Sequence, residues 1–598
     1  MPAIDPHSPG RHTSFVPGPT SPLLQNVHAR AVRDLGGHWR AIVDPYENGY
    51  LDYRGQPHTA EGYFVDRKPA SPSDRVEYDF DRAESLVVPG DWNSQRRELF
   101  LYEGTVWYRR RFEAARAPGQ RTFLHFGAAN TRARVYLDGV LVGEHRGGFT
   151  PFDLEVTDRL GTGEHSLVVQ VDDRRRPDAV PALNTDWWNY GGLTREVLLV
   201  EVPETFLRDY EVRLEPTRPD RLSGWVKLDG PARRQQVTIS IADAGVRTVV
   251  STDADGFAPF EVDARLERWS PERPRLYPVE IVAGADRIVD RIGFRTIEAR
   301  GTEIRLNGQP VFLRGVSLHE QAPLREGRAH GEADARTLLG WAQELGANFV
   351  RLAHYPHDEH TVRLADAMGL MLWAEIPVYW TIDWESSDAF EDARSQLEEL
   401  VARDRNRASV IIWSVGNETP PTAPRLSFLR ELVSRVRRLD PTRLVSAALE
   451  RREVDPLTQR IDDPLGADLD VLGCNEYLGW YEGLPDRPDG VRWETPYRKP
   501  LVMTELGADA LAGHHGTSLT RWTEEYQAAV YDHQLRMLEG ILFLAGMSPW
   551  ILTDFRSPRR TLPGIQDGWN RKGLISDRGE RKLAFGILQR HYRKLSGR

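Results

Sequence analysis

The stretch from Val410 to Gly416, written VIIWSVG, decides the fold that this sequence predicts. A short, almost wholly apolar run that ends at a glycine is typical of a strand buried on both faces, as in a parallel sheet. Eight such runs, this one included, lie after residue 298: Val311 to Val316, Asn348 to Ala353, Leu370 to Glu375, Val410 to Gly416, Leu444 to Leu449, Asp470 to Tyr477, Leu501 to Glu505 and Ile541 to Trp550. Eight alternations of strand and helix in roughly 300 residues indicate a (β/α)8 TIM barrel over 298–598.

Amphipathic stretches separate these runs. Before Gly346, a glycine suited to ending a helix, apolar residues recur at helical spacing: Leu338, Leu339, Ala342 and Leu345. Between the third and fourth runs the same spacing is seen at Phe390, Ala393, Leu397, Leu400 and Val401. Asp388 and Glu391 are placed there like the cap pair of a helix N-terminus. Both stretches are therefore predicted to be helices.

The first half of the chain has a different pattern, with short runs of period two broken by turn residues. Residues 30–203 predict a jelly-roll-like β-sandwich of the sugar-binding kind, in which Asp138-Gly139 is a strong hairpin signal. Residues 204–297 have the length and alternation of an immunoglobulin-like β-sandwich. Residues 1–29 are expected to be a disordered tail, because the first 22 are rich in Pro, Gly and Ser. The predicted fold class is thus multidomain β plus α/β.

The composition excludes several classes of function. Lys and Arg total 78 against 88 Asp and Glu, a net charge of −10 that argues against nucleic-acid and anionic-membrane partners. Cys474 is the only cysteine, so neither an intrachain disulfide nor a cysteine metal site is expected. The 17 histidines show no H-E-x-x-H or similar spacing, and no metal is predicted. Without a signal-peptide pattern or an apolar span, the cytoplasm is expected, with the periplasm as the alternative if a native signal peptide precedes this sequence.

Two carboxylates follow predicted barrel strands. Glu418 comes directly after the fourth strand and Glu505 ends the seventh. In a TIM barrel both would emerge at the same rim, from nearly opposite walls. Retaining glycoside hydrolysis needs such a pair about 5 Å apart, one as a general acid and one as a nucleophile. A glutamate at a strand end is more often solvated or ion-paired, so the two positions together carry the prediction.

The surrounding motifs resemble those of glycoside hydrolase family 2. Asn348 to Pro356, NFVRLAHYP, is similar to the family's N-x-x-R-x-x-H-Y-P element, and Asp404 to Glu418, DRNRASVIIWSVGNE, resembles its acid/base signature. Two β-sandwiches followed by a barrel are also the family's usual architecture. The resemblance implies that Glu418 is the acid/base and Glu505 the nucleophile, and the charge of a nearby second carboxylate would raise the pKa of the acid.

The same resemblance implies roles for neighbouring side chains. Asn417 would donate to the sugar 2-hydroxyl, and Arg351 and His354 would orient the nucleophile and the sugar. Aromatic residues at strand ends, Tyr477 and Trp550, are either core or part of a sugar platform. His319 and Glu375, at the ends of the first and third strands, are weaker candidates.

A basic cluster near the C-terminus points to the substrate. Within Gly568 to Gly573, GWNRKG, Asn570 and Lys572 are two apart on a loop after the eighth strand, where they can converge on one small anion. The run resembles the Asn-x-Lys-Gly element with which β-glucuronidases bind C6 of glucuronic acid. A solvated cationic loop is the alternative.

Two further segments resemble those of glucuronidases. Thr185 to Gly192, TDWWNYGG, is similar to the segment that sends an Asp, here Asp186, from the first domain into the sugar site. Asn475 to Tyr481, NEYLGWY, has tyrosines in the matching places, Tyr477 and Tyr481. Glu476 and Leu478 depart from the pattern, where the family has Arg and Tyr, and leave the finer specificity open.

The sequence therefore predicts a retaining exo-β-glucuronidase that needs no cofactor. Its expected partner is a carbohydrate with a terminal uronic acid, with no nucleic acid and no membrane, and a homo-oligomer is left open. A β-galacturonidase and a β-galactosidase of the same family are the alternatives among enzymes. A noncatalytic carbohydrate-binding protein is the alternative of another class.

Overall fold

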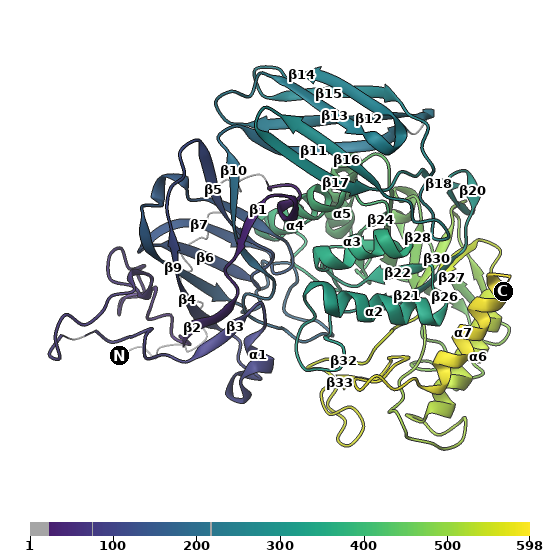
Figure 1. The fold of residues 1–598 in the computed structure, drawn as a ribbon. Coiled ribbons are helices and arrows are strands. Elements are labelled where there is room, and N and C mark those ends of the chain that lie inside the picture. The colour runs from purple at the N-terminus through teal and green to yellow at the C-terminus, as the bar shows by residue number, and fades with distance from the viewer. Residues whose placement is uncertain (1–22, 75, 216–217, 598) are drawn as a thin grey trace.

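The computed structural model describes residues 23–74, 76–215 and 218–597. Its C-terminal half is a closed barrel of eight parallel strands, with two β-sandwiches packed beside it (Figure 1). The barrel strands, in order around the barrel, are β21 (Leu313–Leu318), β22 (Phe349–Leu352), β23 (Met371–Glu375), β24 (Val410–Asn417), β25 (Leu444–Leu449), β28 (Leu472–Asn475), β30 (Leu501–Glu505) and β31 (Leu544–Met547). The predicted fold class is confirmed, and β25 and β30 have the predicted bounds.

Strand β28 is shorter than the predicted run from Asp470 to Tyr477. Asp470 lies before the strand, where its carboxylate accepts a hydrogen bond from the Val445 N–H at 2.8 Å. After the strand the chain turns, and the Glu476 N–H donates to the Glu505 carbonyl at 3.0 Å. Apolar composition alone does not show where such polar contacts end a strand.

Helices surround the barrel: α2 (Gly331–Leu345), α3 (Glu359–Met368), α4 (Ser387–Asp404), α5 (Ala423–Leu439), α6 (Glu524–Glu539) and α7 (Leu583–Leu595). The apolar stripe predicted for α2 is buried against the barrel, where each leucine stabilises the fold by about 1.5–3 kcal/mol. Gly346 ends that helix at φ +91°, as predicted. The N-cap of α4 is Ser386, whose hydroxyl accepts from the Ala389 N–H at 3.2 Å, so Asp388 lies in the first turn rather than at the cap.

The first sandwich consists of a four-stranded and a six-stranded sheet. Their strands are β1 (Ala31–Asp34), β10 (Val197–Pro203), β5 (Gln120–Phe126) and β8 (Phe152–Glu155) in one sheet, and β3 (Ser85–Val88), β2 (Gly37–Val43), β4 (Thr105–Ala114), β9 (Gly163–Asp172), β6 (Arg132–Leu137) and β7 (Val140–Arg146) in the other. β6 and β7 form the predicted hairpin. Asp138 and Gly139 have φ of +50° and +79°, the pair of positive values that a type I′ turn requires.

The second sandwich also has two sheets: β11 (Phe206–Glu215), β12 (Arg218–Asp229) and β15 (Phe257–Asp263) in one, and β14 (Val246–Ser251), β13 (Gln236–Ile241), β16 (Tyr277–Ala283) and β17 (Asp286–Ile292) in the other. Shorter elements complete the fold: α1 (Trp92–Gln95), β18 (Ile297–Arg300), β19 (Glu303–Leu306), β20 (Gln309–Pro310), β26 (Arg452–Asp455), β27 (Thr458–Arg460), β29 (Arg492–Glu494), β32 (Phe555–Arg556) and β33 (Trp569–Asn570). None of the helices in the described ranges is long and apolar enough to cross a membrane.

The tail predicted over 1–29 is too long at its C-terminal end. Residues 1–22 lie outside the described residues, whereas Leu24 and Val27 are buried in a small cluster with Phe123 and Phe206. A 3-10 helix, η1 (Val27–Ala29), follows directly. The packed chain therefore begins before residue 30.

Candidate active site

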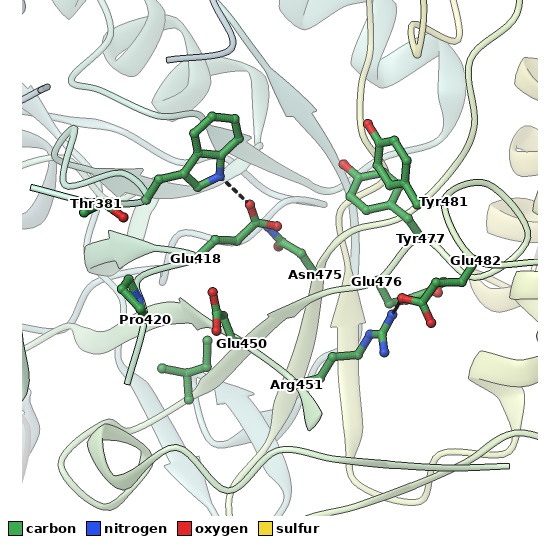
Figure 2. A pocket seen from close by; sticks show the side chains of 12 residues that line it. Thr381, Glu418, Pro420, Glu450, Arg451, Asn475, Glu476, Tyr477, Tyr481 and Glu482 are labelled. Carbon is green, nitrogen blue, oxygen red and sulfur yellow. Dashed lines mark hydrogen bonds and ion pairs between the residues drawn. The ribbon is translucent and has the colours of Figure 1, made fainter. Parts of the chain in front are cut away.

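Glu418 lies at the mouth of the barrel, immediately after β24. Its carboxylate accepts one hydrogen bond from the Trp380 indole N–H at 2.8 Å and another from the Asn475 amide at 2.8 Å. Figure 2 shows its side chain next to that of Asn475. The backbone of Glu418 is left-handed, with φ +47°, a conformation that costs a non-glycine residue about 1–3 kcal/mol and is concentrated at functional sites. This strained backbone conformation orients the Glu418 side chain.

Glu505 ends β30 and is almost entirely buried. One carboxylate oxygen accepts from the Arg351 guanidinium at 2.8 Å, and the other accepts from the Tyr477 hydroxyl at 2.6 Å. His354 is near the first oxygen, with its Nε2 at 3.8 Å. These three side chains hold the carboxylate in one orientation.

Arg351, from β22, organises the base of the site. It donates to both oxygens of Glu375 at 3.3 and 3.0 Å and to the Asn417 side-chain oxygen at 2.7 Å. Within the described chain the Asn417 amide nitrogen is buried and has no hydrogen-bond partner, although its oxygen is fully used. A buried donor without a partner costs roughly 1–3 kcal/mol, so this NH2 group is suited to a ligand acceptor.

Burial and neighbouring charges shift the pKa values of Glu505 and Glu375 in opposite directions. Burial raises the pKa of Glu505 to about 7, an effect that Glu418 increases and that Arg351 and Tyr477 oppose. Burial acts in the same direction on Glu375, but Arg351 and His354 overcome it and hold the pKa of this acid at about 2. The structure thus gives a raised pKa to Glu505, the residue predicted to be the nucleophile.

Aromatic and imidazole rings surround this network. Trp550 stacks on His354, with ring centroids 4.8 Å apart, and His319 packs edge-on against Trp550 at 5.1 Å. Burial lowers the pKa of both histidines, so each is a neutral ring at neutral pH. His354 shares a hydrogen bond of 2.9 Å with Glu375. The weaker candidates His319 and Glu375 are therefore in the layer beneath the site.

Of the two cations in GWNRKG, only Lys572 reaches the site. Its ammonium is 2.9 Å from the Tyr481 hydroxyl and 5.5 Å from the ring centroid of Tyr477, the residue that contacts Glu505. The same ammonium is paired with Asp509 at 2.7 Å, so part of its charge is already balanced. Arg571 turns away and pairs with Asp577 at 2.6 Å.

Asp186 reaches the same region from the first sandwich. Its carboxylate accepts from the Ser557 hydroxyl at 2.5 Å, from the Asn570 amide at 3.2 Å and from Arg560, which also contacts Tyr481. The structure therefore brings Asp186, Asn570, Lys572 and Tyr481 into one cluster, which adjoins Tyr477, the residue that contacts Glu505. In this cluster Asp186 is bound by protein donors.

A pocket beside Glu418 has a volume of about 550 Å³ and is lined by Glu418, Asn475, Tyr477 and Tyr481, among others (Figure 2). The other residues that line it are Trp380, Thr381, Pro420, Leu449, Glu450, Arg451, Glu476 and Glu482. Sequence reasoning missed Trp380, which positions Glu418, and Asp509, which pairs with Lys572. Only the short spacing from Glu505 to Asp509 could have pointed to the latter.

Models of known families match most of the chain. The sugar-binding domain of glycosyl hydrolases family 2 matches residues 33–203, and the TIM-barrel domain of the same family matches residues 297–539. The chain belongs to glycoside hydrolase family 2. It is therefore a glycoside hydrolase, and its partner is a carbohydrate.

Relatives of this family 2 enzyme extend over nearly its full length. A β-glucuronidase from Paenibacillus borealis is 27% identical over 94% of this chain and 96% of its own. A β-glucuronidase from an uncultured Clostridium species is similar in structure, with TM-score 0.80 and 26% identity over 95% of this chain and 98% of its own. A family 2 β-galacturonidase from Eisenbergiella tayi bound to galacturonate has TM-score 0.79 and 25% identity over the same shares.

Proposed function

We propose that this enzyme is a retaining exo-β-glucuronidase. The observation that carries the proposal is the position of Lys572. Its ammonium lies against Tyr477 and Tyr481, and the Tyr477 hydroxyl contacts Glu505. A sugar with C1 at Glu505 would thus present C6 toward a buried cation, and a carboxylate there gains a charge-assisted hydrogen bond that a hydroxymethyl group does not.

Two carboxylates carry the two steps of the proposed reaction. The Glu505 carboxylate attacks C1, while the Glu418 carboxyl gives its proton to the glycosidic oxygen as the C1–O bond breaks and the aglycone leaves as an alcohol. Glu418, now a carboxylate, then takes a proton from water, whose oxygen attacks C1 and breaks the ester bond to Glu505. The unpartnered amide of Asn417 is the donor for the sugar 2-hydroxyl.

Around the uronate, Lys572 and Asn570 are the proposed ligands of the sugar carboxylate, with Tyr481 holding the ammonium. Asp186 acts through Asn570 and Arg560, and Trp550 and His354 form the face against which the ring lies. Lys572 has three N–H donors, of which Asp509 and Tyr481 use two in the structure. The third is available to the substrate.

The aglycone side is proposed to be open. The pocket continues past Glu418 along Trp380, Thr381 and Glu450, giving room for a further sugar residue. An oligosaccharide capped by a uronic acid should therefore be cleaved with kcat/KM comparable to that of an aryl glucuronide. Cleavage of aryl glucuronides alone would contradict the open site.

The direct test compares nitrophenyl β-glucuronide, β-galacturonide and β-galactoside. The glucuronide should be preferred. Preference for the galacturonide, which differs at C4, is the main alternative because the structure is similar to that of a β-galacturonidase. Preference for the galactoside would overturn the uronate proposal. Binding of glucuronides without any turnover would favour a noncatalytic carbohydrate-binding protein.

Lys572→Met should lower kcat/KM for the glucuronide by about 10–100-fold, because it removes a hydrogen bond to a charged group. The value of kcat/KM for the galactoside should stay the same or rise. Methionine keeps the apolar stem, but the single change leaves the buried Asp509 carboxylate without its ammonium partner. The double variant Lys572→Met/Asp509→Asn removes both charges and provides the matched control for stability. If the double variant has the Tm of the wild type and still prefers the glucuronide, Lys572 does not recognise the sugar carboxylate.

The activity should depend on pH through Glu505, which must be ionised to attack. Because burial raises its pKa to about 7, kcat/KM should fall about tenfold per pH unit below that value. Tyr477→Phe removes a hydrogen bond that lowers this pKa, so its acid limb should move to higher pH. Tyr481→Phe is the control, since its hydroxyl contacts Lys572 instead, and its acid limb should not move. A wild-type acid limb centred near pH 4.5 would contradict the assignment.

A further inference from the structure

Three potential metal ligands from distant parts of the chain meet at the junction of the first sandwich and the barrel. His28 is on the 3-10 helix η1, Glu196 immediately precedes β10, and His360 is in the first turn of α3. One ligand atom from each lies within 4.8 Å of the others. His28 Nε2 is 3.0 Å from a Glu196 carboxylate oxygen.

A fourth residue orients His360 in the way that metal sites usually require. The Nδ1 atom of His360 is 2.9 Å from an oxygen of Asp358, so an N–H on this side can donate to the carboxylate, which leaves Nε2 as the ring nitrogen for a metal. The hydrogen bond to Asp358 raises the pKa of His360 to about 9, so a metal that binds at Nε2 displaces a proton. Asp358 is itself fixed, because it is the N-cap of α3 and accepts the His360 backbone N–H at 2.9 Å. A carboxylate behind a histidine selects the tautomer and increases its basicity toward a metal.

We propose that His28, Glu196 and His360 bind one divalent transition-metal ion, with Zn²⁺ as the best match. Two imidazoles and one carboxylate form a zinc ligand set, whereas Mg²⁺ and Ca²⁺ take oxygen ligands. Ligand atoms around a tetrahedral zinc are about 3.3 Å apart, so the three side chains need to close only slightly. Glu196 and Asp358 both place negative charge near the ion, and Asp358 is also 3.9 Å from the Arg195 guanidinium.

The place of the cluster suits an ion that links parts of the fold. The side chains of His28, Glu196 and His360 are 30%, 27% and 29% exposed, so an ion can enter from solvent and water can fill the fourth position. Bound there, the ion joins the N-terminal segment, the sandwich and a barrel helix. An ion that binds the folded state alone raises the free energy of unfolding.

The test uses the full chain, freed of any affinity tag and treated with EDTA. Equilibrium dialysis against ZnCl2 should give one tightly bound equivalent, and Co²⁺ should produce the visible absorption of a tetrahedral site. Tm should rise with ZnCl2 and fall back with EDTA. His28→Ala and Glu196→Gln should each weaken Zn²⁺ binding at least tenfold and remove the Tm response. Glu196→Gln keeps the side-chain shape, so it separates loss of a ligand from misfolding.

His533→Ala is the matched control, because His533 also pairs with a carboxylate, Asp489, at 2.8 Å but has no second histidine in a cluster of this kind within the described ranges. This variant should bind Zn²⁺ like the wild type. The proposal is overturned if the wild type takes up no equivalent at 100-fold excess Zn²⁺ over protein, or if His28→Ala and Glu196→Gln bind as tightly as His533→Ala. In either case the cluster is a set of ordinary ion pairs.

Discussion

Glu505→Gln is expected to reduce kcat/KM for nitrophenyl β-glucuronide by about 10⁴-fold or more, because the amide cannot form the ester to C1. Binding of a glucuronide should survive, since the oxygen of the introduced amide can still accept a hydrogen bond from Arg351, which now contacts the Glu505 carboxylate. Steady-state kinetics and a binding titration on the same preparation measure the two effects separately.

Glu450→Gln is the matched control for Glu505→Gln. It removes a carboxylate from the pocket that Glu418 lines, yet Glu450 lies beside the aglycone in our proposal and should change kcat/KM by only a few fold. Glu505→Ala with added azide sharpens the test. Azide can then attack C1 from the opposite face of the sugar and give an α-glycosyl azide. Retention of a tenth of the activity by Glu505→Gln would place the nucleophile elsewhere.

Glu418→Gln should show a loss that depends on the leaving group. For a poor leaving group such as an alkyl glucuronide, kcat/KM should fall by about 10²–10⁴-fold, because no proton reaches the departing oxygen. A dinitrophenyl glucuronide leaves without protonation, so its first step should be far less affected. Measuring kcat/KM across a series of phenols of graded acidity gives the comparison.

For this variant too, azide distinguishes the role. With an activated substrate, Glu418→Ala should yield a β-glycosyl azide, because azide replaces the water that Glu418 would otherwise activate. Equal losses for all leaving groups, with no azide product, would mean that Glu418 acts through positioning alone. Trp380→Phe provides a milder check, since it removes one of the two hydrogen bonds to Glu418 and should reduce the rate only modestly.

Much of the architecture was predictable because the barrel strands are buried on both faces. The strands at Leu444–Leu449 and Leu501–Glu505 are continuous apolar runs, and their ends were correct. The positions of Glu418 and Glu505 followed from strand ends alone. Strand β28 was predicted too long because Asp470 contacts a neighbouring strand, a pairing with no local signal.

Side-chain partners from other segments were beyond the sequence. Nothing in the order of residues indicates that the Trp380 indole N–H supports Glu418, and the short spacing from Glu505 to Asp509 does not show that Asp509 pairs with Lys572. Of the basic cluster, Lys572 lies against Tyr477 and Tyr481, whereas Arg571 pairs with Asp577. Local patterns predict which segment reaches a rim; the tertiary packing decides which side chains turn inward.

The burial of Glu505 also sets its contribution to the stability of the fold against its contribution to turnover. Its pKa of about 7 is above the ordinary 4.5, so folding takes up a proton, and the stability that this group contributes is full below about 4.5 and lost as pH rises through 7. Burial also raises the pKa of Glu476, to about 8, so its contribution to stability is likewise lost as pH rises. Turnover needs ionised Glu505 and increases over that range. The buried carboxyls of Glu505 and Glu476 therefore stabilise the fold most at a pH below that at which Glu505 is ionised for turnover.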